Sequence, residues 1–116
     1  MTTGERLAEL SAWIDEAVTG TEAERLWGRT AKIAEENGEV VAAIIGYLGQ
    51  NPRKGRTHDL NDVVAELLDV AVTALGAVES LTGNQGTAMA SLDAKVRSVH
   101  ERMRAHRERR ARIAAV

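Results

Sequence analysis

The apolar residues of this chain recur at steps of three and four, and this periodicity constrains its fold more than any other feature. Four segments carry such a stripe, and none shows the period of two that is typical of strands. The stripes are Leu7, Leu10, Ile14 and Val18; Leu26, Ile33, Val40, Val41, Ile44, Ile45 and Leu48; Leu60, Val63, Val64, Leu67, Leu68, Ala71, Leu75 and Val78; and Met89, Leu92, Val96, Val99 and Met103. We therefore predict an all-α protein, an antiparallel four-helix bundle that forms one domain over residues 1–116.

Polar caps and glycines mark the expected helix boundaries. The expected N-caps are Thr2, Thr21, Asp59 and Thr87, and the first two would form capping boxes with Glu5 and Glu24. Gly20 and Gly49 end the first two helices, and the turn over residues 83–86 ends the third. The single proline, Pro52, falls in the loop between the second and third helices, where it interrupts neither of them.

Composition narrows the class of protein. The chain has no cysteine, which excludes disulfides, thiolate metal sites and a cysteine nucleophile. It has no signal-peptide pattern and no apolar run of the roughly 18 residues that a membrane span needs, so we expect a cytoplasmic protein without a membrane partner. The region from Lys95 to Arg112 carries eight basic residues and two glutamates. Such a helix is more often a solvated face than a nucleic-acid site, and we do not expect nucleic acid as a partner.

Two pairs of acidic residues, Glu36/Glu39 and Glu66/Asp69, repeat the same spacing of three on successive helices. Both pairs point away from the main apolar stripe of their helix, and such acids usually face water. However, antiparallel helices can bring both acidic strips to one cleft. Converging carboxylates repel one another unless a cation lies between them. Oxygen-only ligands select magnesium, or manganese as the alternative, and magnesium commonly shares its ligand shell with substrate phosphates.

The segment KIAEENGE at residues 32–39, followed after a basic loop by ELLD at residues 66–69, resembles the signature of the MazG-like all-α nucleotide pyrophosphohydrolases. The match covers about residues 26–82, the expected core of the metal site. The resemblance implies Mg²⁺-dependent hydrolysis of a nucleoside triphosphate to the monophosphate and pyrophosphate, by a homodimer or homotetramer. It implies that Glu36, Glu39, Glu66 and Asp69 bind the metal. Glu35 would be a further ligand or the base that orients the attacking water.

The expected substrate contacts are basic or lie near the basic loop: Lys32, Lys95, Arg53, Lys54 and Tyr47. Trp27 lies near the apolar stripe, so we interpret it as a core residue rather than a base-stacking one. Three alternative functions stay open: a catalytically silent MazG-like bundle that binds nucleotide or a protein partner, a phosphoribosyl-ATP pyrophosphohydrolase, and a nucleic-acid-binding module that uses the basic last helix. The sequence names neither the base nor the sugar of the substrate.

Overall fold

The computed structural model describes residues 1–116 and consists of four helices without a strand. They are α1 (Thr3–Ala17), α2 (Glu22–Leu48), α3 (Leu60–Leu81) and α4 (Ala88–Ala114). The prediction of an all-α, four-helix fold is confirmed. None of the four offers the long, nearly uncharged apolar stretch needed to traverse a bilayer.

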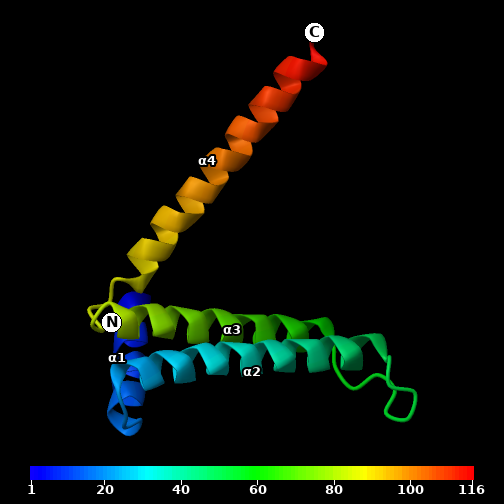
Figure 1. Cartoon of the computed structure of the whole chain (residues 1–116). Coiled ribbons are helices and arrows are strands. Elements are labelled where there is room, and N and C mark those ends of the chain that lie inside the picture. Colours follow the sequence, from blue (N-terminus) through cyan, green and yellow to red (C-terminus); the bar gives the residue numbers. More distant parts are fainter.

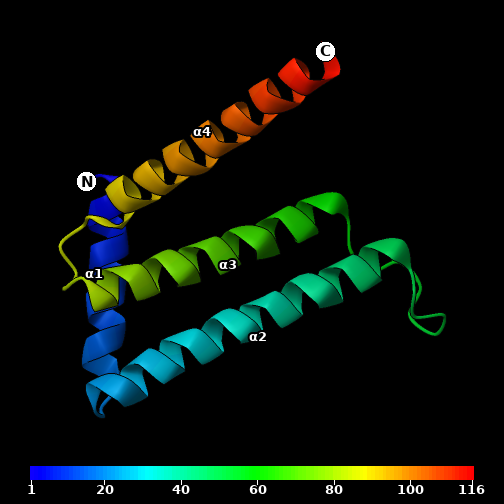
Figure 2. The same ribbon diagram turned by 45° about the horizontal axis from the view of Figure 1, so that its top comes forward.

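Helices α2 and α3 form an antiparallel hairpin, and α1 crosses one end of it (Figures 1 and 2). The loop of residues 49–59 closes the opposite end, where Gly49 adopts the left-handed conformation with φ of 65°. Helix α4 starts at the corner formed by α1 and α3 and projects away from the hairpin (Figure 1). The molecule is therefore elongated, with principal dimensions of 61 × 46 × 30 Å.

All four predicted N-cap residues occupy the N-cap position, and three of them accept a capping hydrogen bond. The Thr2 hydroxyl accepts a hydrogen bond from the Glu5 amide at 3.1 Å, and the Glu5 carboxylate accepts one from the Thr2 amide, which completes a capping box. Asp59 makes the same reciprocal arrangement with Asp62. At Thr21 only half of the predicted box exists, because the hydroxyl accepts from the Glu24 amide at 3.2 Å without a reciprocal bond.

Thr87 occupies the predicted N-cap position of α4, but its side chain makes no capping hydrogen bond. The start of α4 is held instead by Glu79, whose side chain is completely buried. One carboxylate oxygen of Glu79 accepts from the Gly86 amide at 2.9 Å, and the other accepts from the Ala88 amide at 2.7 Å. The apolar periodicity of the sequence did not predict this role of Glu79, because an acid near the end of a helix usually faces water.

The surfaces that α2 and α3 bury against each other overlap the predicted apolar stripes only in part. The least exposed residues are Arg29, Ile33, Glu36, Val40 and Ala43 on α2, with Val63, Glu66, Val70 and Thr73 on α3, and of these only Ile33, Val40 and Val63 belong to the stripes. Most of the stripe stays exposed, for example Val41 at 49% and Leu67 at 52%. The expectation that both acidic pairs lie opposite the packed face is therefore wrong for Glu36 and Glu66. A two-helix hairpin buries only one row of each helix, so a second apolar row needs another surface.

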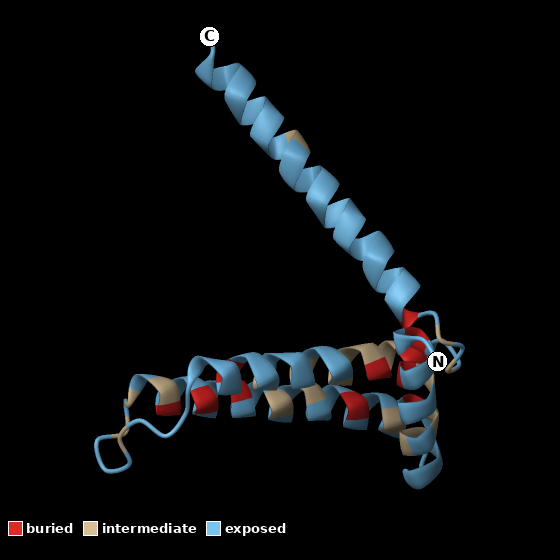
Figure 3. Cartoon of the chain, turned by 180° about the vertical axis from the view of Figure 1, so that it is seen from behind, coloured by how far each residue is buried: buried red, intermediate tan, exposed pale blue.

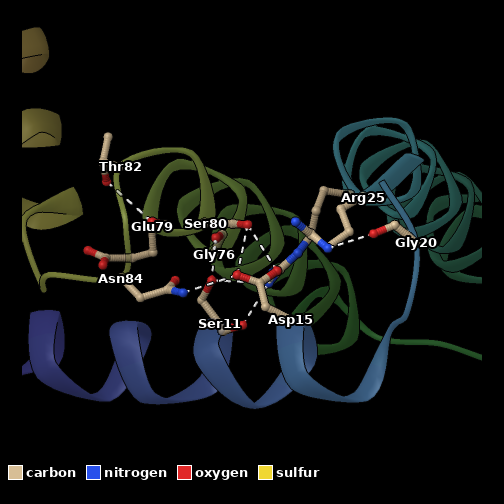
Figure 4. Close-up of polar contacts among 10 residues, drawn as sticks. Ser11, Asp15, Gly20, Arg25, Gly76, Glu79, Ser80, Thr82 and Asn84 are labelled. Atoms are coloured by element: carbon tan, nitrogen blue, oxygen red, sulfur yellow. Dashed lines mark hydrogen bonds and ion pairs between the residues drawn. The ribbon is translucent and has the colours of Figure 1, made fainter. Parts of the chain in front are cut away.

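A polar network ties α1 to the hairpin at the corner (Figure 4). The guanidinium of Arg29, nearly buried, donates to the Ser11 carbonyl at 2.8 Å and to the Asp15 carboxylate at 2.9 Å. Asp15 also accepts from the Ser80 hydroxyl and the Asn84 amide, both at 3.0 Å. Partial burial works to raise the pKa of Asp15, but the hydrogen bonds from Asn84, Arg29 and Ser80 lower it below its ordinary value. The network fixes the angle at which α1 crosses.

The described core is small for a chain of this length. Only 11 of 116 residues are buried, and they lie at the corner and along the inner row of the hairpin (Figure 3). A close backbone contact supports the corner, because a Cβ added to Gly4 would lie 2.6 Å from the Gly86 carbonyl oxygen. Helices α1, α3 and α4 therefore meet at the corner through contacts that bury little apolar surface. Much of the apolar surface of the chain remains exposed.

Candidate metal centre

Three of the four predicted metal ligands converge between α2 and α3. Glu36 and Glu66 lie in the buried row of the hairpin, and Glu39 lies one turn further along α2 at its edge. One carboxylate oxygen of each of the three lies within 4.8 Å of the others. Val40, next to Glu39 in the chain, and Val63, one turn before Glu66, are both buried. We call Glu36, Glu39 and Glu66 the acidic cluster.

The acidic cluster has fewer hydrogen-bond partners than its oxygens can accept. One oxygen of Glu36 and one of Glu66 are inaccessible to solvent and have no donor. The nearest cation is Lys32, whose ammonium lies 3.4 Å from the other Glu36 oxygen and 3.2 Å from Glu35. Hydrogen bonds to Glu35 and then Glu36 raise the pKa of Lys32, so it stays charged. A single ammonium group at the edge leaves most of the negative charge uncompensated.

Repulsion within the acidic cluster raises the pKa of Glu39 above its ordinary value. The negative charge of Glu36 is the largest cause that raises the pKa of Glu39, followed by a hydrogen bond to Glu36, and Glu66 adds to both effects. The three carboxylates therefore cannot all ionise without cost. A divalent cation between them would reverse this balance, because it favours the ionised forms.

Affinity for a divalent cation is expected to fall at acidic pH. The raised pKa means that Glu39 holds its proton over a window above 4.5, the ordinary value, and a metal ion must displace that proton. Calorimetric titration with Mn²⁺ at several pH values from 5 to 7.5 is expected to show affinity that increases with pH. The folding stability of the metal-free protein is expected to change with pH in the opposite direction and to fall as pH rises. The reason is that a carboxyl with a raised pKa in the folded state stabilises the fold less as pH rises through that window. Affinity that is independent of pH would contradict the role of Glu39.

The donor set fits a hard divalent cation. All candidate ligand atoms are carboxylate oxygens, which magnesium and manganese prefer and which zinc seldom takes alone. The two donor-free oxygens of Glu36 and Glu66 point to a group missing from the protein itself, since buried carboxylate oxygens normally have partners. Three carboxylates also leave ligand positions for water or phosphate, as magnesium usually requires.

The remaining predicted ligands lie outside the acidic cluster. Asp69 is exposed on α3 and is not among the three converging residues. Glu35 is exposed on α2 and bonds to Lys32 at 3.2 Å. Asp69 as a metal ligand and Glu35 as the base therefore stay predictions from the motif.

The predicted substrate contacts are dispersed, apart from Lys32. Tyr47 is three turns from Glu36 along α2, about 16 Å away. Its ring is covered by the guanidinium of Arg56 at 5.3 Å, and Arg53 and Lys54 are exposed in the adjoining loop. Lys95 is exposed on α4, which leaves the hairpin (Figure 1). Within one chain, only Lys32 contacts the acidic cluster.

The expectation that Trp27 is a core residue is wrong, since 75% of its side chain is exposed. In this part of α2 the least exposed residues are Arg29 and Ile33, which leaves Trp27 on the outer side of the helix. An apolar stripe indicates which residues avoid water, but it does not identify the surface that covers them.

A cavity of about 450 Å³ lies between α1 and the hairpin and extends to Lys32. It is lined mainly by apolar atoms, and its walls include Leu10, Ile14, Gly28, Arg29, Lys32 and Thr73. Its volume falls within the range of small-molecule sites. Because Lys32 contacts both this cavity and Glu36, the cavity adjoins the acidic cluster. Sequence reasoning missed it, because no local motif specifies how α1 crosses the hairpin.

No family model matches the chain, and no curated protein or solved structure matches it either. Function must therefore be inferred from the acidic cluster, the adjoining cavity and the motif that both helices carry.

Proposed function

We propose that this chain is a Mg²⁺-dependent nucleoside triphosphate pyrophosphohydrolase that converts a nucleoside or deoxynucleoside triphosphate to the monophosphate and pyrophosphate. The observation that carries the proposal is the convergence of Glu36, Glu39 and Glu66 with two buried oxygens that lack a donor. The resemblance of residues 32–39 and 66–69 to the family signature supports the same reaction.

The side chains of the acidic cluster would hold the cation, and Asp69 is the fourth proposed ligand. When bound, the cation lowers the pKa of a coordinated water and offsets charge on the phosphates. Glu35 is the proposed base that accepts the proton of the attacking water. Its carboxylate lies 3.2 Å from the Lys32 ammonium, which orients it on the surface of α2. Lys32 would donate to a phosphate oxygen, because its ammonium lies between the acidic cluster and the cavity.

The cavity between α1 and the hairpin is the proposed site for the nucleoside. Its apolar lining suits a base and a sugar, while the triphosphate would extend past Lys32 to the cation. The hydrolysis breaks one P–O–P bridge: water supplies a hydroxyl to one phosphorus, and the pyrophosphate or nucleotide oxygen leaves with the electron pair.

The test is product analysis on a panel of ribonucleoside and deoxynucleoside triphosphates, with and without Mg²⁺. We expect pyrophosphate and the nucleoside monophosphate in equal amounts, and no turnover in EDTA. Orthophosphate and the diphosphate as products would contradict the proposal. Absence of turnover on every triphosphate, with nucleotide binding retained in calorimetry, would instead favour the catalytically silent bundle.

The family resemblance also implies a homodimer or homotetramer. The exposed apolar residues of α2, α3 and α4 support self-association, because a monomer rarely leaves so much contiguous apolar surface in water.

A further inference from the structure

The distal half of α4 carries a dense group of arginines. Six of the eleven residues from 102 to 112 are arginine, and only one, Glu108, is acidic. All six side chains are exposed, and none forms an ion pair; the single ion pair of α4 joins Arg97 to Asp93 at 3.0 Å. We call these six residues the arginine group: Arg102, Arg104, Arg107, Arg109, Arg110 and Arg112.

The structure separates the arginine group from the acidic part of the chain. Of the 15 basic and 17 acidic residues of the chain, α4 holds eight and three, so the other residues hold seven and 14. In a closed bundle the acids of the hairpin would lie beside α4 and offset its charge. Here Glu79 holds the start of α4 through the amides of Gly86 and Ala88, and the helix runs away from the hairpin (Figure 1). The arginine group is therefore left without a counter-charge from its own chain.

The arginines surround the helix instead of forming one basic face. At about 100° per residue they point in six directions, and no gap between neighbouring directions is wider than about 80°. The positions that would continue the apolar stripe beyond Met103 are occupied by His106 and Arg110. A helix that lies on a lipid surface needs a continuous apolar side and a separate basic side. The distal half of α4 has neither, so it does not suit a membrane.

The groove of a nucleic-acid duplex presents negative charge on both sides of a bound helix. The major groove of B-form DNA is about 12 Å wide, which admits an α-helix of about 10–12 Å in diameter. Arginine matches phosphate oxygens with two parallel hydrogen bonds, which lysine cannot do, and residues 102–112 contain no lysine. They also contain no asparagine or glutamine, the side chains that read adenine. Contacts to phosphates should therefore outnumber contacts to bases.

We propose that the distal half of α4 lies in the major groove of double-stranded DNA and binds phosphates of both strands, with little dependence on base sequence. The acidic hairpin stays outside the groove, because the phosphates repel it. The proposal does not depend on whether the acidic cluster binds a metal.

The test is fluorescence anisotropy of a labelled DNA duplex of about 20 base pairs, titrated with the full chain in EDTA. EDTA removes divalent cations, so no metal at the acidic cluster can link the hairpin to a phosphate. About four to six phosphate contacts predict that affinity falls about 100-fold or more between 50 and 200 mM salt. Duplexes of different sequence are expected to bind within about threefold of one another.

Two double variants with the same change in charge locate the contact. Arg104→Gln with Arg109→Gln removes two charges from the arginine group, and glutamine preserves helix propensity. This variant is expected to bind DNA at least about 10-fold more weakly at 100 mM salt, and the slope of log affinity against log salt should become shallower by about two. The control, Arg53→Gln with Lys54→Gln, changes the basic loop between α2 and α3 and is expected to stay within about threefold of the wild type. Circular dichroism of both variants verifies that the helices are retained.

Three results would overturn the proposal. The first is a wild-type chain that does not bind DNA at 50 mM salt, whether or not it binds vesicles that contain phosphatidylserine. The second is a loss of affinity in the loop variant equal to that in the α4 variant. The third is an RNA duplex of the same length that binds as tightly as DNA, because the major groove of A-form RNA is too narrow to admit the helix.

Discussion

Replacing Glu39 by glutamine is expected to reduce pyrophosphate release at least about 100-fold, since even residues that only support metal ligands change metal affinity or activity by 10- to 100-fold. The substitution keeps the shape of the side chain and removes its charge. Glu39 lies at the edge of the acidic cluster, so packing of the hairpin should not change. The measurement is steady-state turnover at saturating Mg²⁺, followed by a titration with excess Mg²⁺.

The same variant is expected to stabilise the metal-free protein. The pKa of Glu39 is raised chiefly by the charge of Glu36, so removing its charge relieves repulsion in the folded state. In EDTA the unfolding temperature of the variant should therefore exceed that of the wild type. On addition of Mg²⁺ the order should reverse, because bound ligand stabilises by about 2.7 kcal/mol at 100 times its dissociation constant.

The control is Glu9→Gln, the same chemical change at an exposed position of α1. It is expected to leave turnover and both unfolding temperatures unchanged. If Glu39→Gln lowered the stability of the metal-free protein and left turnover intact, the acidic cluster would be a structural feature rather than a cation site.

Replacing Glu79 by alanine is expected to destabilise the protein by about 3 kcal/mol, because it leaves one buried and one partly buried amide group without an acceptor at about 1–3 kcal/mol each. The affected groups are the amides of Gly86 and Ala88, which both bind the buried carboxylate. Thermal unfolding at a fixed protein concentration should show a fall in Tm of about 10 °C. Glu79→Gln keeps one acceptor oxygen and is expected to lose about half as much.

An exposed acid on α4 provides the comparison. Glu101→Ala removes a carboxylate without removing a buried hydrogen bond, so its effect is expected to stay within about 0.5 kcal/mol. Equal effects of the two alanine substitutions would show that Glu79 does not hold the joint between α3 and α4.

Local sequence determined the helices well, because helix starts depend on neighbouring residues. Thr2 with Glu5 and Asp59 with Asp62 close their hydrogen bonds within one turn, and no distant residue is needed. For the start of α4 the predicted position, Thr87, is right, but the acceptor that holds it was missed. Its acceptor is Glu79, nine residues before Ala88 and on another helix, so a reading limited to adjacent positions assigned it to Thr87.

The acidic cluster could be predicted only in part from the sequence. A spacing of three placed Glu36 beside Glu39, and the repeat on the next helix predicted that Glu66 meets them. The same reasoning included Asp69, which the structure leaves exposed outside the converging group. The difference lies in rotation: Glu66 lies in the row of α3 that faces α2, and a step of three residues turns Asp69 by about 60° out of that row.

The sequence by itself determined that the chain forms four helices, where three of them are capped, and which residue types could bind a hard cation. Those properties depend on periodicity and on contacts within a turn. Only the tertiary structure decided which row of each helix is packed, that Glu36 and Glu66 are buried together, and that α4 leaves its own hairpin. Such choices depend on how long-range contacts such as those of Arg29 with Asp15 and of Glu79 with Ala88 orient whole helices, and no local pattern encodes that orientation.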